Sequence, residues 1–172
     1  MRKAISTVMC GLLILLLCAC GQPGATSSPP DFPEEFHADA AVSVGDYTIL
    51  SHVQYAPDYL ELTFQSPAVL QKLKMTYNGD ACSVSYDNLS VNLDVSRFPE
   101  AAFGRVIVQA MRKCVSRAEI TTEFTGTEWL YRGKVGAGDF ELTQDPNTGA
   151  IRRISCEELG LTISFSNIQT GE

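Results

Sequence analysis

The sequence lacks the short motifs by which many metal-dependent and nucleophilic enzymes are recognised. Its two histidines, His37 and His52, have no His or Cys partner at metal-site spacing, and no HExxH occurs. Gly-x-Ser-x-Gly is also missing, and the glycines around Lys134 are not followed by the Gly-Lys-Ser/Thr of a phosphate-binding loop. We therefore expect a non-enzymatic protein with no catalytic residue, metal or cofactor, and a cell-wall hydrolase is the least favoured function.

Positive charge is scarce too. Thirteen Lys and Arg stand against twenty Asp and Glu, which gives a net charge of −7. Such a chain lacks the basic surface that holds nucleic acid, so we expect no nucleic-acid partner. A hydrophobic content of 45%, a charged content of 19% and a length of 172 residues suit one globular domain.

The only long apolar run is Ala4–Leu17, which is shorter than the roughly 20 residues of a membrane-spanning helix. It follows Met1-Arg2-Lys3 and therefore predicts a signal peptide over residues 1–19. Residues 17–21, Leu-Cys-Ala-Cys-Gly, resemble the lipobox of bacterial lipoproteins. The resemblance implies that Cys20 is lipidated and becomes the first mature residue, so that acyl chains anchor the protein to the extracytoplasmic face of the cell membrane. A plain secretory signal is the alternative.

The rest of the chain divides into a tether and a domain. Residues 20–35 contain four prolines and little to bury, which predicts a semi-rigid spacer. Residues 36–169 form the predicted domain, in which apolar residues recur with a period of two. This pattern indicates about nine short antiparallel strands, and Asn78-Gly79 is a strong hairpin signal between two of them.

Two segments break the strand pattern. Ser66-Pro67 predicts a short helix as far as about Lys72, because Ser is a good N-cap and Pro suits the first helical position. Pro99–Ser116 has Phe103 and Ile107 on one helical face and Arg105 and Arg112 on the other, which predicts a longer amphipathic helix that lies on the sheet. The fold class is therefore α+β.

Several segments resemble the lipoprotein-carrier superfamily of the bacterial envelope (LolA/LolB-like). They are 62–67 (Leu-Thr-Phe-Gln-Ser-Pro), 138–142 (Gly-Asp-Phe-Glu-Leu) and 161–167 (Leu-Thr-Ile-Ser-Phe-Ser-Asn). Within that superfamily the chain is most similar to short lipoproteins of spore-forming Gram-positive bacteria, including the germination lipoproteins. The resemblance implies a strongly curved antiparallel sheet, a half-barrel capped by two helices, with an apolar cavity on its concave side.

The residues that could line such a cavity are apolar residues of the predicted strands and the longer helix. They are Leu62, Phe64, Met75, Val84, Phe103, Ile107, Trp129, Tyr131 and Phe140. A solidly packed core would give the same pattern, because periodicity does not distinguish a lined cavity from a filled one.

Two function hypotheses follow. The first is membrane-anchored, non-enzymatic binding of a lipid, a lipoprotein or another apolar group on the concave sheet. The alternative is a protein-interaction module that docks or activates a cell-envelope enzyme of spore germination or the cell wall.

Two further features have open interpretations. Cys82, Cys114 and Cys156 all fall on predicted core faces, so they are either small buried residues or include one disulfide. Arg105 and Arg112 lie seven residues apart on the outward face of the longer helix. They form either a basic surface for anionic lipid headgroups or an acidic partner, or a solvated helix face.

Overall fold

The computed structural model describes residues 28–79, 81–94 and 102–171. The predicted signal peptide, the predicted lipidation site Cys20 and the first half of the predicted tether lie outside these residues. Among the described residues, no helix combines the length and the apolar character needed to cross a membrane.

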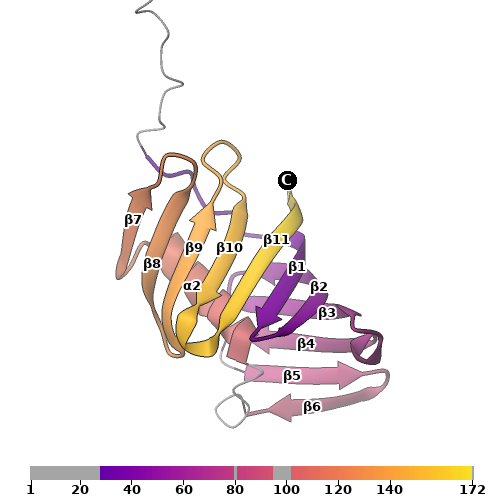
Figure 1. The fold of residues 1–172 in the computed structure, drawn as a ribbon. Coiled ribbons are helices and arrows are strands. Elements are labelled where there is room, and N and C mark those ends of the chain that lie inside the picture. The colour runs from indigo at the N-terminus through magenta and orange to yellow at the C-terminus, as the bar shows by residue number, and fades with distance from the viewer. Residues whose placement is uncertain (1–27, 80, 95–101, 172) are drawn as a thin grey trace, which may run out of the picture.

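The described residues form one antiparallel sheet of eleven strands in the order β6-β5-β4-β3-β2-β1-β11-β10-β9-β8-β7 (Figure 1). The strands are β1 Phe36–Val44, β2 Tyr47–Ala56, β3 Tyr59–Ser66, β4 Leu73–Asn78, β5 Ala81–Tyr86, β6 Leu89–Leu93, β7 Ile120–Phe124, β8 Trp129–Val135, β9 Gly138–Gln144, β10 Ile151–Cys156 and β11 Leu161–Thr170. The curved antiparallel sheet is confirmed, and within the described part of the chain β6 and β7 form its two edges, so the sheet does not close.

The predicted number of about nine strands is wrong, because β6 and β7 were missed. Both are edge strands, which pair on one side only in the described part of the chain. Neither contains a buried residue, and Thr121, Thr122 and Glu123 give β7 a largely polar sequence. Their apolar alternation is therefore short and weak.

The prediction of two capping helices is also wrong for the described residues. The segment after Ser66-Pro67 forms a single turn of 3₁₀ helix, η1 (Ala68–Leu70), closed by the amide of Leu70 on the carbonyl of Pro67 at 2.9 Å. Lys72 then has a φ of 77°, which ends any helix before β4 begins. The longer helix is present as α2 (Ala102–Ser116), and its predicted first residues lie outside the described part.

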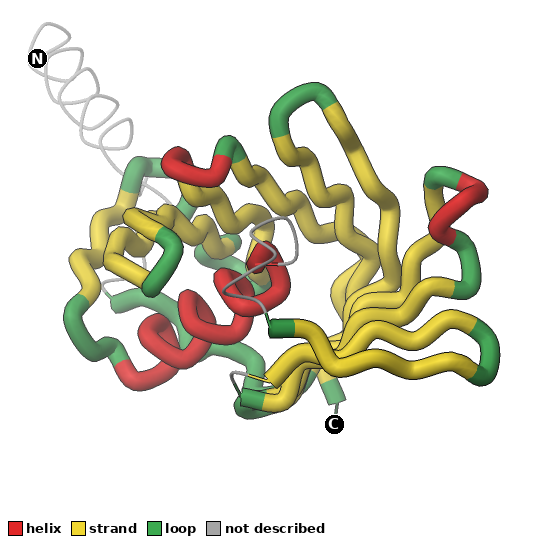
Figure 2. Tube along the Cα trace, turned by 90° about the horizontal axis from the view of Figure 1, so that it is seen from below, coloured by secondary structure: helices red, strands yellow, loops and turns green. Residues whose placement is uncertain are grey.

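α2 lies within the curve of the sheet (Figure 2). Its buried apolar side chains face the strands. It packs mainly against β8 and β3 and buries Ile107, Met111 and Cys114 completely. The inward side chains of β1–β3 and β8–β11 close around it to form one core. The helix therefore fills the central part of the concave side.

The last residues of the predicted tether are attached to the sheet. Phe32 packs edge-on against Tyr131, with ring centroids 4.8 Å apart. The buried amide of Gln144 accepts a hydrogen bond from the Tyr131 hydroxyl at 2.6 Å and donates to the carbonyls of Asp31 (3.2 Å) and Gly149 (2.8 Å). These contacts hold the chain before β1 against the start of β8 and the end of β9.

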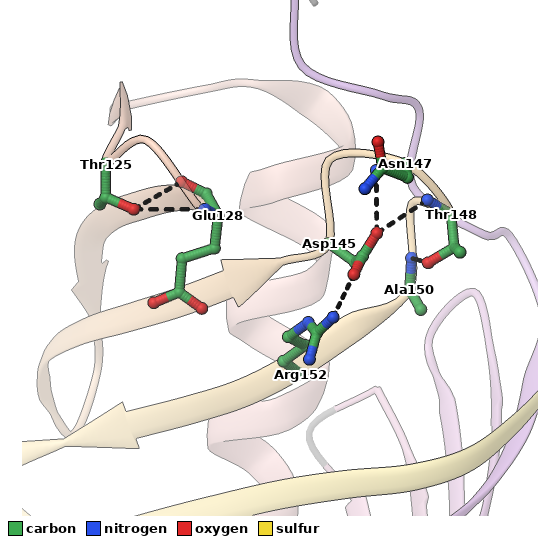
Figure 3. A network of polar contacts seen from close by, with 7 residues as sticks. All are labelled: Thr125, Glu128, Asp145, Asn147, Thr148, Ala150 and Arg152. Atoms are coloured by element: carbon green, nitrogen blue, oxygen red, sulfur yellow. Dashed lines mark hydrogen bonds and ion pairs between the residues drawn. The ribbon is translucent and has the colours of Figure 1, made fainter. Parts of the chain in front are cut away.

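A polar network holds the turn between β9 and β10 (Figure 3). The Asp145 carboxylate accepts hydrogen bonds from the amides of Asn147 at 2.8 Å and Thr148 at 2.9 Å and forms an ion pair with Arg152. The Arg152 guanidinium and the Thr148 amide hold the pKa of this carboxyl well below its usual range. The turn therefore supports the ends of the strands on which Phe32 rests.

Candidate functional site

Eight of the nine side chains predicted to line a cavity are buried in the core. They come from β3, β4, β8, β9 and α2 and are Leu62, Phe64, Met75, Phe103, Ile107, Trp129, Tyr131 and Phe140. Phe64 meets Phe103 of α2 edge-on, with centroids 6.5 Å apart, which shows how the helix and the sheet fill the space between them. Val84 on β5 is the exception, because it is only partly buried.

Three rows of apolar residues cross β4, β5 and β6 on the concave side, and Val84 lies in one of them. The strand register places Tyr77, Cys82 and Leu93 in the first row, Met75, Val84 and Val91 in the second, and Leu73, Tyr86 and Leu89 in the third. Side chains in one row of a sheet point to the same face. The sheet therefore presents nine apolar positions on one continuous surface.

Exposure rises along these rows from the helix outward. Tyr77 is fully buried, whereas Tyr86 is 44% exposed, Val91 60% and Leu89 73%. The six residues of these rows that stay exposed or only partly buried are here called the open apolar face: Leu73, Val84, Tyr86, Leu89, Val91 and Leu93. Figures 1 and 2 show β5 and β6 extending past α2.

The boundary of the open apolar face is set where α2 meets β4. Gly104 of α2 lies directly on the ring of Tyr77, so close that a Cβ atom on Gly104 would be 2.1 Å from Tyr77 Cε2. Tyr77 and Cys82 are buried beside the helix, and this burial raises the pKa of both groups. Within each row, exposure increases toward β6.

The open apolar face contains no charged residue, and β5 and β6 carry none on the reverse side of the sheet either. On β5 and β6 the outward residues are Ser83, Ser85, Ser90 and Asn92. The ion pair of Lys72 with Asp87 at 3.2 Å lies at the strand ends and is solvent-exposed. A ligand on the open apolar face would therefore meet aliphatic and aromatic groups, with the Tyr86 hydroxyl as its polar contact.

A groove of about 1170 Å³ lies at the other end of the sheet and, unlike the open apolar face, is lined by many charged residues. It is lined mostly by outward residues of β8–β11, among them Arg132, Lys134 and Glu141, and by Phe140 of the predicted cavity set. Its charged side chains satisfy one another: Arg132 pairs with Glu141 at 2.7 Å and with Glu123 at 2.9 Å, and Lys134 with Asp139 at 3.2 Å. Because these ion pairs neutralise one another, the groove does not present an unpaired charge from Arg132 or Lys134 to a ligand.

The predicted basic surface is largely neutralised in the structure. Arg112 donates from Nε to Asp58 Oδ1 at 2.9 Å, and its neighbour Lys113 pairs with Glu119 at 2.5 Å. Arg105 is partly buried, unlike a free surface arginine. The two arginines therefore do not form one free patch, and their role as a binding surface stays a prediction.

The histidines lie away from the open apolar face, whereas Cys82 is buried next to it, beside Leu93. His37 and His52 stack on the outer side of the sheet with centroids 6.1 Å apart, and His52 Nδ1 lies 3.3 Å from Asp39 Oδ1. No cluster of three metal-binding side chains occurs among the described residues. Cys82, Cys114 and Cys156 are buried free thiols, so the disulfide among them is not formed.

Comparison with known proteins finds similarity only in the fold. No family model and no curated protein matches the sequence. An uncharacterized conserved protein from Thermus thermophilus superimposes with a TM-score of 0.50 at 10% identity, over 81% of this chain and 80% of that one. A LolA superfamily protein from Nitrosomonas europaea superimposes with a TM-score of 0.46 at 10% identity, over 83% of this chain and 89% of that one. The Thermus match shows that the unclosed, curved sheet is shared with another protein.

Proposed function

We propose that the chain is a non-enzymatic binding protein that holds an acyl chain, the lipid of a lipoprotein or another apolar group on the open apolar face. The observation that supports this most is the gradient of exposure across β4–β6, which ends in Leu89 at 73% and Val91 at 60%. Soluble surfaces seldom leave contiguous apolar side chains in water unless a partner covers them. Burial of one such side chain contributes about 1.5–3 kcal/mol, so three of them would hold a flexible apolar ligand.

The place of action in this proposal is the outer surface of the cell membrane. Lipidation of Cys20 would attach the domain there through the spacer that ends at Phe32. Because Phe32 rests on Tyr131 of β8, the attachment enters at the far side of the sheet from β6. The open apolar face would then be free to receive its ligand while the protein stays anchored, which suits a receptor better than a shuttle.

A fluorescent fatty acid titration tests the proposal. The chain from residue 20 with Cys20→Ser carries no lipid of its own and is titrated with a nitrobenzoxadiazole-labelled fatty acid. We expect saturable binding that the double variant Tyr86→Ser/Leu89→Ser weakens about tenfold or more, because each replacement removes apolar contact area. Val115→Ser is the matched control, since Val115 is 49% exposed on α2, away from β4–β6.

Two results would count against this function. One is the absence of both probe binding and copurified acyl species in the unsubstituted chain. The other is equal affinity in the double variant and the Val115→Ser control. If a cell-envelope protein instead bound in stoichiometric amount through Tyr86 and Leu89, with no apolar ligand present, the interaction-module alternative would be favoured.

A further inference from the structure

β6 presents an unprotected strand edge. It is the last strand on its side of the sheet among the described residues and has the sequence Leu-Ser-Val-Asn-Leu, with no charged residue and no proline. Its first four residues are exposed. Edge strands of soluble proteins usually carry Lys, Glu or Pro, or are covered, because free backbone N–H and C=O groups recruit another strand.

The opposite edge of the same sheet does carry such protection. β7 has Glu123 as its fourth residue of five, and this carboxylate forms an ion pair with Arg132 of β8 at 2.9 Å. A charge on an edge strand disfavours pairing with another strand. The two edges of one sheet thus differ, and in the described part of the chain the β6 edge is the one that lacks such a charge.

The sequence of β6 is also symmetric about its middle residue. We propose that β6 pairs antiparallel with β6 of a second copy of this chain, in a register centred on Val91. The facing pairs would be Leu89 with Leu93, Ser90 with Asn92, and Val91 with its own copy. Apolar residues then face apolar residues on the concave side, and hydroxyl faces amide on the outer side, which are favourable cross-strand pairs.

Electrostatics also favour this edge as the point of contact. The whole chain has a net charge of −7, so two copies repel over most of their surfaces. β6 and the outward side of β5 contribute no charge within their strands. A two-fold axis through Val91 gives an isologous contact, which closes as a dimer and does not propagate.

The dimer joins two open apolar faces into one. Antiparallel pairing about a two-fold axis perpendicular to the sheet keeps both concave sides on the same side of the joined sheet. Leu89 and Val91 of each copy would lie beside Leu93 and Val91 of the other. The pairing itself uses the backbone edge, so it goes beyond the proposed function and needs no ligand.

Charge substitutions on the outer side of β6 test the pairing without touching the open apolar face. In Ser90→Lys/Asn92→Lys, each lysine of one copy would face a lysine of the other, and like charges directly opposite destabilise a strand pair. In Ser90→Lys/Asn92→Glu, each lysine would face a glutamate in the register centred on Val91. Both variants change the same two exposed positions, so each is the matched control of the other.

The readout is sedimentation of the full chain in a nonionic detergent matched to the solvent density. We expect a dimer for the unsubstituted chain, a dissociation constant raised about tenfold or more in the Lys/Lys variant, and recovery to within about threefold in the Lys/Glu variant. Circular dichroism of each variant checks that the sheet is retained. A monomer at about 100 µM for the unsubstituted chain would overturn the proposal.

Two further outcomes would also overturn it. Unchanged self-association in the Lys/Lys variant would show that another surface holds the copies together. Failure of the Lys/Glu variant to recover would show that β6 does not pair in the register centred on Val91. Because none of these changes alters a residue of the open apolar face, fatty acid binding can persist in a monomer, and loss of the dimer is distinguishable from failure of the proposed function.

Discussion

Replacement of Gly104 by alanine tests how α2 closes the central part of the sheet. An alanine Cβ would lie 2.1 Å from Cε2 and 2.4 Å from Cζ of Tyr77, where ordinary contacts begin at about 3.4 Å. Tyr77 is fully buried between β4 and the helix, so its ring has no space into which to turn. The helix must therefore move away from the sheet, or β4 must give way.

The expected cost follows from two opposing effects. Overpacking of a well-filled core costs about 1–3 kcal/mol. Alanine favours a helix over glycine by about 1 kcal/mol, and less near a helix start such as this. We therefore expect Gly104→Ala to lower the free energy of unfolding by about 1–2 kcal/mol, measured in urea through the fluorescence of the single tryptophan, Trp129.

Two comparisons separate the steric effect from a general effect of alanine. In a Tyr77→Leu background, Gly104→Ala should be neutral or stabilising, because the ring atoms it would meet are gone. Gly136→Ala should change stability by less than about 0.5 kcal/mol, since the nearest atom to its Cβ is Gln109 Oε1 at 3.8 Å. A more stable Gly104→Ala protein in the native background would refute the reasoning.

Three other substitutions or reactions probe the support of the fold. Phe32→Ala should lower stability by about 1–2 kcal/mol and speed proteolysis before residue 36, because the ring packs on Tyr131; unchanged cleavage would argue against this anchor. Asp145 has a pKa below its unfolded value of about 3.9 and so stabilises the fold at neutral pH; this contribution is lost as the pH falls below about 4. Asp145→Asn should therefore cost about 1–2 kcal/mol at pH 7 in urea titrations, and this cost should shrink steadily as the pH is lowered from about 4 toward the lowered folded-state pKa; a cost that stays the same down to about pH 2 would contradict the role of Arg152. Burial raises the pKa of Cys114 to about 12, so iodoacetamide should alkylate it only in urea, as peptide mass mapping would show; rapid native labelling would mean that α2 opens.

The central strands could be predicted from the sequence because the core imposes a period of two on them. Val42 and Val53, for example, are fully buried in β1 and β2, and their outward neighbours are more polar. The same logic located α2, whose buried residues repeat every three to four positions. What these patterns report is burial, and they are strongest where a second layer covers the strand.

β6 was missed for the same physical reason. Leu89, Val91 and Leu93 do alternate with Ser90 and Asn92, but nothing in the described part of the chain packs over most of them, and the run is only five residues long. The candidate cavity residues rest on the same apolar alternation, which is clearest in strands that α2 covers, so most of them lie in the covered part of the concave side. The signal that could have revealed the open part was an alternating apolar strand directly after the Asp87-Asn88 turn.

The dimensions of the two layers explain why part of the concave side stays open. α2 has 15 residues and is therefore about 22 Å long. Eleven strands spaced about 4.8 Å apart extend for about 48 Å along the curve. One helix cannot cover that width, and α2 packs from β4 and β3 across to β8, which leaves β5 and β6 beyond one side and β7 beyond the other.

The two ends of the sheet that α2 does not cover differ in their exposed side chains. β7 places Phe124 against Trp129, with centroids 5.1 Å apart, and puts the charge of Glu123 on its outer side, so its apolar surface is largely covered. β6 places Leu89 and Val91 in water and carries no charged residue. If exposed apolar area were merely what a short helix leaves behind, both ends would show it. Of the two ends, the β5–β6 end alone shows it among the described residues, with Tyr86, Leu89 and Val91 exposed. This difference argues that this end of the sheet is built to be covered by something else, a ligand on its face and a second strand on its edge.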